Sequence, residues 1–114
     1  MVQHRTLLYL YETIRSKEVI ATGYYPKLEG AKDGSFVVLK GAKMRKQPTH
    51  TALRDITTRQ RLESMHPHDE HYYTLSTDTH FNSPSHAASI LFGKEVDGLA
   101  LWVNTHETPL SELL

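Results

Sequence analysis

The sequence predicts a small single domain of the α+β class, with an antiparallel sheet of about four to five strands and two to three helices. Its 114 residues, of which 39% are hydrophobic, suit one compact core. Short runs rich in Leu, Val, Ile and Tyr alternate with Gly-containing turns early in the chain, which favours strands. A later apolar, Ala-rich segment with a Ser-Pro start and a Gly end favours a helix.

The N-terminal third predicts an antiparallel meander of three strands. Their sequences are RTLLYLYETI (residues 5–14), EVIATGYYP (18–26) and SFVVLKG (35–41). Between the second and third strands, Gly30 and Gly34 can adopt positive φ, and Asp33-Gly34 is a strong hairpin signal.

Residues 49–65 predict a helix with Thr49 or Thr51 as its N-cap. Its apolar residues do not form a single stripe at about 100° per residue, so we expect the helix to be irregular or largely exposed. They are Leu53, Ile56, Leu62 and Met65. A polar loop follows over 66–71, and alternation over 71–77 indicates a fourth strand.

The segment 81–103, FNSPSHAASILFGKEVDGLALWV, contains the sharpest local signals. Ser83 suits an N-cap because its hydroxyl can accept a hydrogen bond from a first-turn amide. Pro84 suits the first helical position, and Gly93 can end the helix in the left-handed conformation. We therefore expect a helix over 83–92.

The remainder of the chain predicts a turn, a strand and a short helix. Asp97-Gly98 is turn chemistry, and residues 99–103 alternate as a last strand that carries Trp102. Residues 108–114 are expected to form a short terminal helix.

Composition removes several classes of protein and site. The absence of cysteine excludes disulfides and thiolate zinc sites. No apolar run approaches the ~20 residues that cross a bilayer, and the start of the chain is too polar for a signal peptide. A cytosolic location, with no membrane partner, is the default expectation.

Charge is distributed unevenly along a chain whose formal net charge is zero. Residues 1–39 carry five basic and four acidic side chains, residues 40–61 carry seven and one, and residues 62–114 carry one and eight. The local balances are therefore +1, +6 and −7, which suggests an anion-binding face, with nucleic acid as the usual candidate. Solvated charge clustering is the alternative. The seven basic residues are Lys40, Lys43, Arg45, Lys46, Arg54, Arg59 and Arg61.

From about Gly23 to Val103 the chain resembles the small bacterial and viral family called domain of unknown function 4357. It is also similar to the restriction-enzyme-adenine-methylase-associated (RAMA) domain. The family pattern is a buried strand ending Gly-Ser, a helix, a strand, Phe-x-Ser-Pro-Ser-x-Ala-Ala, a Gly, and Asn-Gly before a Trp. The matching positions are Gly41 with Ala42, then Phe81, Ser83, Pro84, Ser85, Ala87, Ala88, Gly93, Asp97, Gly98 and Trp102.

The chain departs from the family pattern at two positions. Ala42 replaces the usual Ser, which removes any ligand contact by that hydroxyl, and Asp97 replaces the usual Asn but still suits a turn. Relatives commonly accompany GIY-YIG nuclease domains or restriction–modification proteins. The resemblance thus implies a DNA-associated setting, without implying an activity.

Two groups of residues could contact nucleic acid beside the basic segment. Ser83 and Ser85 lie at a helix N-terminus, where amides and hydroxyls can bind phosphate, although simple capping explains one Ser equally well. Trp102 and the tyrosine pairs could stack bases, whereas burial in the core is the alternative for Trp102. One Tyr of each pair should face outward in an alternating strand. The pairs are Tyr24-Tyr25 and Tyr72-Tyr73.

Metal binding and catalysis find little support in the sequence. HPHDEH (residues 66–71) contains ligand-type side chains, but it includes Pro and lacks a helical i, i+4 spacing, so we expect an exposed loop. No nucleophile elbow or Cys is present, and no Gly-Ile-Tyr or Tyr-Ile-Gly motif of a nuclease occurs. No cofactor is expected.

We therefore expect a non-enzymatic nucleic-acid-associated module that contacts DNA through the seven basic residues, Ser83 and Ser85. The alternative is a protein-interaction adaptor, such as a phage or plasmid factor acting on a host defence component, whose acidic C-terminal half could mimic DNA. An enzyme of unrecognised type is a third, weaker hypothesis.

Overall fold

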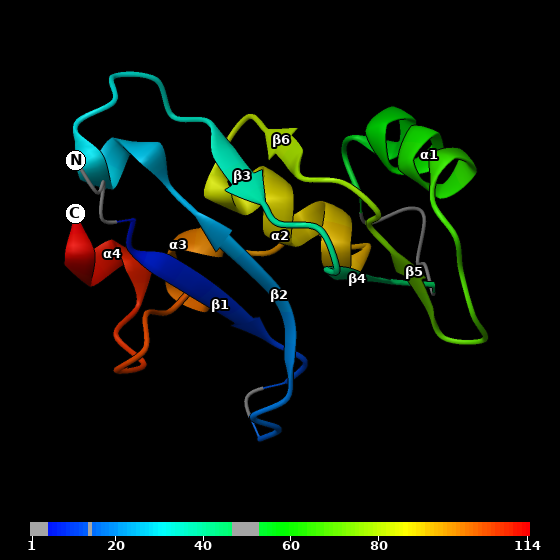
Figure 1. The fold of residues 1–114 in the computed structure, drawn as a ribbon, viewed down its shortest axis with the longest axis horizontal. Helices are drawn as coiled ribbons and strands as arrows, with labels where there is room; N and C mark the ends of the chain where they lie inside the picture. Colours follow the sequence, from blue (N-terminus) through cyan, green and yellow to red (C-terminus); the bar gives the residue numbers. More distant parts are fainter. Residues whose placement is uncertain (1–4, 14, 47–52) are drawn as a thin grey trace.

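The computed structural model describes residues 5–13, 15–46 and 53–114, and its α+β architecture confirms the predicted class (Figure 1). A four-stranded antiparallel sheet has the order β1-β2-β3-β6, and β4 and β5 form a separate two-stranded antiparallel sheet. The strands are β1 (Leu7–Tyr11), β2 (Val19–Tyr24), β3 (Phe36–Val38), β4 (Lys43–Arg45), β5 (Tyr72–Thr74) and β6 (Thr79–Phe81). The helices are η1 (Pro26–Glu29), α1 (Ile56–Met65), α2 (Pro84–Phe92), α3 (Gly98–Leu101) and α4 (Leu110–Leu113).

The core lies between the larger sheet and α2, which runs behind β3 in Figure 1. Every residue of β3 is buried, as expected for a strand paired on both sides and covered by a helix. Ala87 and Ala88 are fully buried, and their small side chains let α2 approach the sheet closely. Phe36 and Trp102 fill the centre, with ring centroids 4.5 Å apart.

The N-terminal meander and the signals around α2 are confirmed. Ser83 is the N-cap of α2, where its Oγ accepts a hydrogen bond of 3.0 Å from the His86 amide. Gly93 ends the helix at φ 79°, and its amide donates to the Ser89 carbonyl. β1, β2 and β3 pair in the predicted order, and α4 forms within the expected terminal segment.

The helix predicted over 49–65 is shorter than expected. Thr49 and Thr51 lie outside the described residues, and α1 begins at Ile56 with Asp55 as its N-cap. The Asp55 carboxylate accepts from the Thr58 amide at 3.0 Å, so it supplies the capping oxygen that the prediction assigned to a threonine. The helix is regular through residues 57–58 and buries Leu62 and Arg59.

The strand predicted over 99–103 is wrong. Residues 98–101 form the helical turn α3 because the Asp97 carboxylate accepts a hydrogen bond from the Leu99 amide and caps it. At the end of this segment only Val103 pairs as a strand, and it exchanges two backbone hydrogen bonds with Tyr9 of β1. The alternating pattern was therefore outweighed by local capping and by the packing of α3 on α2.

The turn between β2 and β3 is longer than a tight hairpin. It contains η1, which ends at Gly30 with φ 98°, whereas Gly34 does not adopt a left-handed conformation. Asp33 stabilises the turn by accepting a hydrogen bond from the Ser35 amide.

A junction joins the start of α2 to α3 and to Trp102. The Gly98 amide donates to Ser85 Oγ at 2.8 Å, and the Trp102 indole Nε1–H donates to the Pro84 carbonyl at 3.0 Å. Gly98 packs so closely that a Cβ there would lie 2.3 Å from the Pro84 carbonyl oxygen. Gly98 is therefore required by close backbone approach and not by a positive φ.

Gly98→Ala should lower the free energy of unfolding by about 1–3 kcal/mol, because the added methyl group collides with backbone atoms that cannot move independently. Gly34→Ala is the matched control, since its Cβ would meet only ordinary contacts from 3.7 Å outward. It should change the free energy by less than about 1 kcal/mol. Urea unfolding followed by circular dichroism measures both, and equal effects of the two substitutions would contradict the role assigned to Gly98.

Candidate functional site

The predicted anion site at the start of α2 is occupied by the chain itself. Ser83 Oγ accepts from the His86 amide, and Ser85 Oγ accepts from the Gly98 amide. Pro84 contributes its carbonyl to Trp102, which is fully buried. Ser83 and Ser85 thus have structural hydrogen bonds that explain both hydroxyls of the Ser-Pro-Ser motif without a ligand.

Arg59 is buried in the core, with 2% of its surface exposed. Its guanidinium donates to the carbonyl of Ile90 at 2.7 Å and to the carbonyl of Arg45, and its Nε donates to Glu63 at 2.9 Å. Ile90 lies in the last turn of α2, where carbonyl groups lack helical partners. Arg59 therefore ties α1 to α2 and β4, and its placement among phosphate-contacting residues is corrected.

Other members of the basic segment differ in their surroundings. Arg45 is half-buried: its guanidinium pairs with Glu12 at 2.7 Å and lies 4.6 Å from the Phe92 ring centroid. Arg54 is exposed and lies 4.0 Å from Glu95. Lys40 and Arg61 are also exposed.

Two groups of cations and aromatic rings lie on the two-stranded sheet, and we call them together the β4–β5 surface. Lys43 Nζ lies 5.4 Å from the Tyr72 ring centroid, and Lys46 Nζ lies 5.7 Å from that of Tyr73. His68 contacts both members of the second pair, with its Nδ1 2.9 Å from Lys46 Nζ and its ring 5.2 Å from that of Tyr73. All five side chains are exposed or half-buried.

Strand pairing produces this surface. Antiparallel pairing aligns Arg45 with Tyr72 and Met44 with Tyr73, and Met44 is fully buried. The alternation expected for Tyr72-Tyr73 therefore places the two rings on opposite faces of the small sheet. In the other pair, Tyr25 is buried, whereas the guanidinium carbon of Arg5 lies 4.4 Å from the centroid of the Tyr24 ring.

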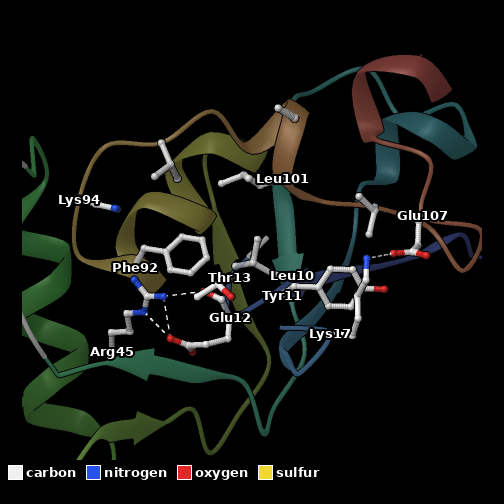
Figure 2. A pocket seen from close by; sticks show the side chains of 13 residues that line it. Leu10, Tyr11, Glu12, Thr13, Lys17, Arg45, Phe92, Lys94, Leu101 and Glu107 are labelled. Atoms are coloured by element: carbon white, nitrogen blue, oxygen red, sulfur yellow. Dashed lines mark hydrogen bonds and ion pairs between the residues drawn. The ribbon is translucent and has the colours of Figure 1, made fainter. Parts of the chain in front are cut away.

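A groove of about 530 Å³ is lined by the end of β1, the end of α2, α3 and Arg45 of β4 (Figure 2). It opens because the chain pairs with β1 at Val103 but turns into α3 at Leu101, away from the strand edge. Sequence reasoning missed the groove because a strand over 99–103 would have continued along that edge. The Glu12–Arg45 and Lys17–Glu107 ion pairs lie along its walls.

Among the residues that the structure describes, Asp55 and His86 form the closest imidazole–carboxylate pair, at 2.8 Å. His86 Nδ1 accepts from the Asn82 amide, which leaves Nε2 as the donor to Asp55. Both ring nitrogens are thus engaged within the fold. Hydrogen bonds from Thr58, and then His86, lower the pKa of Asp55 to about 2. The pair secures α1 to α2 and offers no general base to a substrate.

The loop at 66–71 is exposed as predicted, except at its first residue. His66 is 7% exposed, and its Nδ1 accepts from the Ser76 amide at 3.1 Å. Asp69 accepts from the amides of His71 and Tyr72, and these bonds lower its pKa. Within the described ranges, no three His, Cys, Asp or Glu side chains are placed to hold a metal ion.

Comparison with known families identifies the family of this chain. The model of the family described as Domain of unknown function (DUF4357) matches residues 14–114. The chain belongs to this family. Neither the curated proteins nor the solved structures gave a significant match. In this DUF4357 chain, the motif residues Ser83, Pro84, Ser85, Gly98 and Trp102 meet at one structural junction. None of the helices of the DUF4357 chain in the described ranges is long and apolar enough to cross a membrane.

Arg59→Gln should lower the free energy of unfolding by about 3–5 kcal/mol, because it leaves Glu63 and two carbonyl oxygens without their cationic partner. Arg61→Gln, two residues away and exposed, should change it by no more than about 0.5 kcal/mol. Chemical denaturation measures both. An Arg59→Gln variant as stable as Arg61→Gln would show that the buried contacts do not hold α1.

Asp55 should make stability depend on acid pH. Because its folded pKa lies below the unfolded value of about 3.9, its contribution is present above about pH 4 and is lost as pH falls towards about 2. Asp55→Asn keeps a capping oxygen but does not titrate. The stability difference between wild type and this variant should shrink by about 1 kcal/mol over that range, a value reduced for the partial exposure of Asp55. Thermal melts from pH 2 to 7 test this, and a constant difference would contradict it.

Proposed function

We propose that this protein is a non-enzymatic module that binds single-stranded nucleic acid along β4 and β5, in a cytoplasmic DNA-associated setting. The observation that carries the proposal is the pairing of Lys43 with Tyr72 and of Lys46 with Tyr73 on the β4–β5 surface. Single-strand binders combine cations that follow the backbone with aromatic rings on which bases stack. The small sheet supplies both groups on each of its faces, Lys43 with Tyr72 on one and Lys46 with Tyr73 on the other.

The spacing of the lysines supports contact with successive phosphates. Lys43 opens β4 and Lys46 directly follows it, in a segment that pairs with the chain at 71–75, whereas the exposed Lys40 lies in the turn before β4 that includes Gly41 at φ 93°. At a rise of about 3.3 Å per residue, Lys43 and Lys46 are roughly 10 Å apart along the strand. These three cations can contact neighbouring phosphates of one strand, and the half-buried Tyr rings offer stacking faces to the unpaired bases of a single strand.

The acidic half of the chain gives less support to the adaptor alternative. A DNA-mimicking face needs carboxylates that project freely into solvent. Of the eight acidic residues after residue 61, six have partners within the fold. Asp69, Asp78 and Asp97 accept backbone amides, and Glu63, Glu95 and Glu107 pair with Arg59, Arg54 and Lys17. The formal balance of −7 therefore overstates the charge offered to a partner.

Binding of fluorescein-labelled oligo(dT) should weaken with salt, with a log–log slope of about −2, since three lysines each release about 0.7 counterion on a single strand. The double variant Lys43→Gln/Lys46→Gln should flatten the slope to about −0.7. The matched control Lys27→Gln/Lys32→Gln changes the charge equally at two exposed residues, and it should leave the slope unchanged. Lys27 belongs to η1 and Lys32 follows it, and this segment lies across the molecule from β4 and β5 (Figure 1).

Stacking is tested separately from charge. Tyr72→Leu should weaken binding by about 1–3 kcal/mol, whereas Tyr72→Phe retains the ring and should bind as wild type. Both variants lose the hydrogen bond from the Tyr72 hydroxyl to Glu12, so that bond cannot explain a difference. Absence of oligonucleotide binding at ~50 mM salt and micromolar protein would reject the proposal. Preference for a duplex of the same sequence would reject the single-strand assignment.

A further inference from the structure

We propose that the groove beside β1 binds a small organic carboxylate with an apolar or aromatic body. Its volume of about 530 Å³ lies within the roughly 300–1,000 Å³ range of small-molecule pockets. This inference is independent of the nucleic-acid proposal, because the groove and the β4–β5 surface share none of the residues assigned to binding.

The floor of the groove suits an apolar body. Leu10 and Phe92 are buried beneath it, and Leu101 of α3 is half-buried at its side (Figure 2). Burial of a ring or chain against these side chains would remove apolar surface from water on both partners. Ala100 also lines the groove and is exposed, and its short side chain takes up little of the space.

The charges around the groove favour a single negative charge. Three cations, Lys17, Arg45 and Lys94, and two carboxylates, Glu12 and Glu107, line it, so its formal balance is 3 − 2 = +1. Glu107 pairs with Lys17, and Glu12 engages Nε and Nη2 of Arg45. A monoanion would complete this balance, whereas a phosphate ester with two charges would meet repulsion from the two glutamates.

The carboxylate is expected at the Phe92 end. Arg45 lies over the Phe92 ring, and Lys94 follows Phe92 by two residues, so both cations come from this end (Figure 2). Among the described residues, Nη1 of Arg45 and Nζ of Lys94 have no hydrogen-bond partner. They can therefore donate to a ligand carboxylate while Glu12 holds the Arg45 guanidinium in place.

Titration of the ¹⁵N-labelled full chain with 3-phenylpropionate at pH 7 tests the proposal. Amide shifts of Tyr11, Val96, Ala100 and Leu101 should saturate together, and neutral 3-phenylpropionamide should bind about five-fold more weakly. Lys94→Gln should reduce this preference for the acid without weakening binding of the amide. Lys27→Gln, a distant exposed lysine, should leave both affinities unchanged.

Ala100→Phe provides a steric test, because Ala100 is exposed and its replacement fills the groove without entering the core. The variant should melt as wild type, lose saturable shifts with both probes and retain any oligonucleotide binding. Three results would overturn the proposal: equal affinities for acid and amide, wild-type binding by folded Ala100→Phe, or shifts that lie outside the groove.

Discussion

The close approach of Gly98 to the start of α2 constrains the whole C-terminal half of this fold. Without a Cβ, Gly98 reaches Ser85 and the Pro84 carbonyl, and this places Trp102 under the larger sheet beside Phe36. The Pro84 carbonyl lies in the first turn of α2, and it accepts a hydrogen bond from the indole N–H of Trp102. The motif shared with the family is thus explained as architecture, in which two serine hydroxyls each satisfy a backbone amide.

This junction also determines the position of the groove beside β1. Because α3 turns towards α2, it leaves the edge of β1 next to Tyr11, and the groove opens there. On the other side of α2, Arg59 binds the last-turn carbonyl of Ile90 and the end of β4. The small β4–β5 sheet is therefore fixed to the core through the buried Met44, while Lys43, Lys46, Tyr72 and Tyr73 stay half-buried at its surface.

Local chemistry explains which elements were predictable from sequence. Ser83, Pro84 and Gly93 determine the ends of α2 by short-range capping, and the meander follows from strong β-propensity. The three-residue strands β4 and β6 carry too little pattern to detect. Residues 99–103 alternate like a strand, but 98–101 form a turn of helix through the Asp97 cap and packing on α2, and only Val103 pairs as a strand. The clustering of basic residues over 40–61 can be seen in the sequence itself. Burial of Arg59 and pairing of Arg45 with Glu12 depend on contacts distant in sequence, so composition could not separate structural from accessible cations.

Hydrogen exchange at the junction is the most direct test that the Ser-Pro-Ser motif, Gly98 and Trp102 form a structural centre and not a ligand site. The Gly98 amide and the Trp102 indole N–H should exchange only through global unfolding, with protection equal to the free energy of unfolding from denaturation. Rapid exchange of these two hydrogens while the amides of α2 stay protected would show that α3 detaches from α2 in the native state. That result would contradict the structural role assigned to the motif.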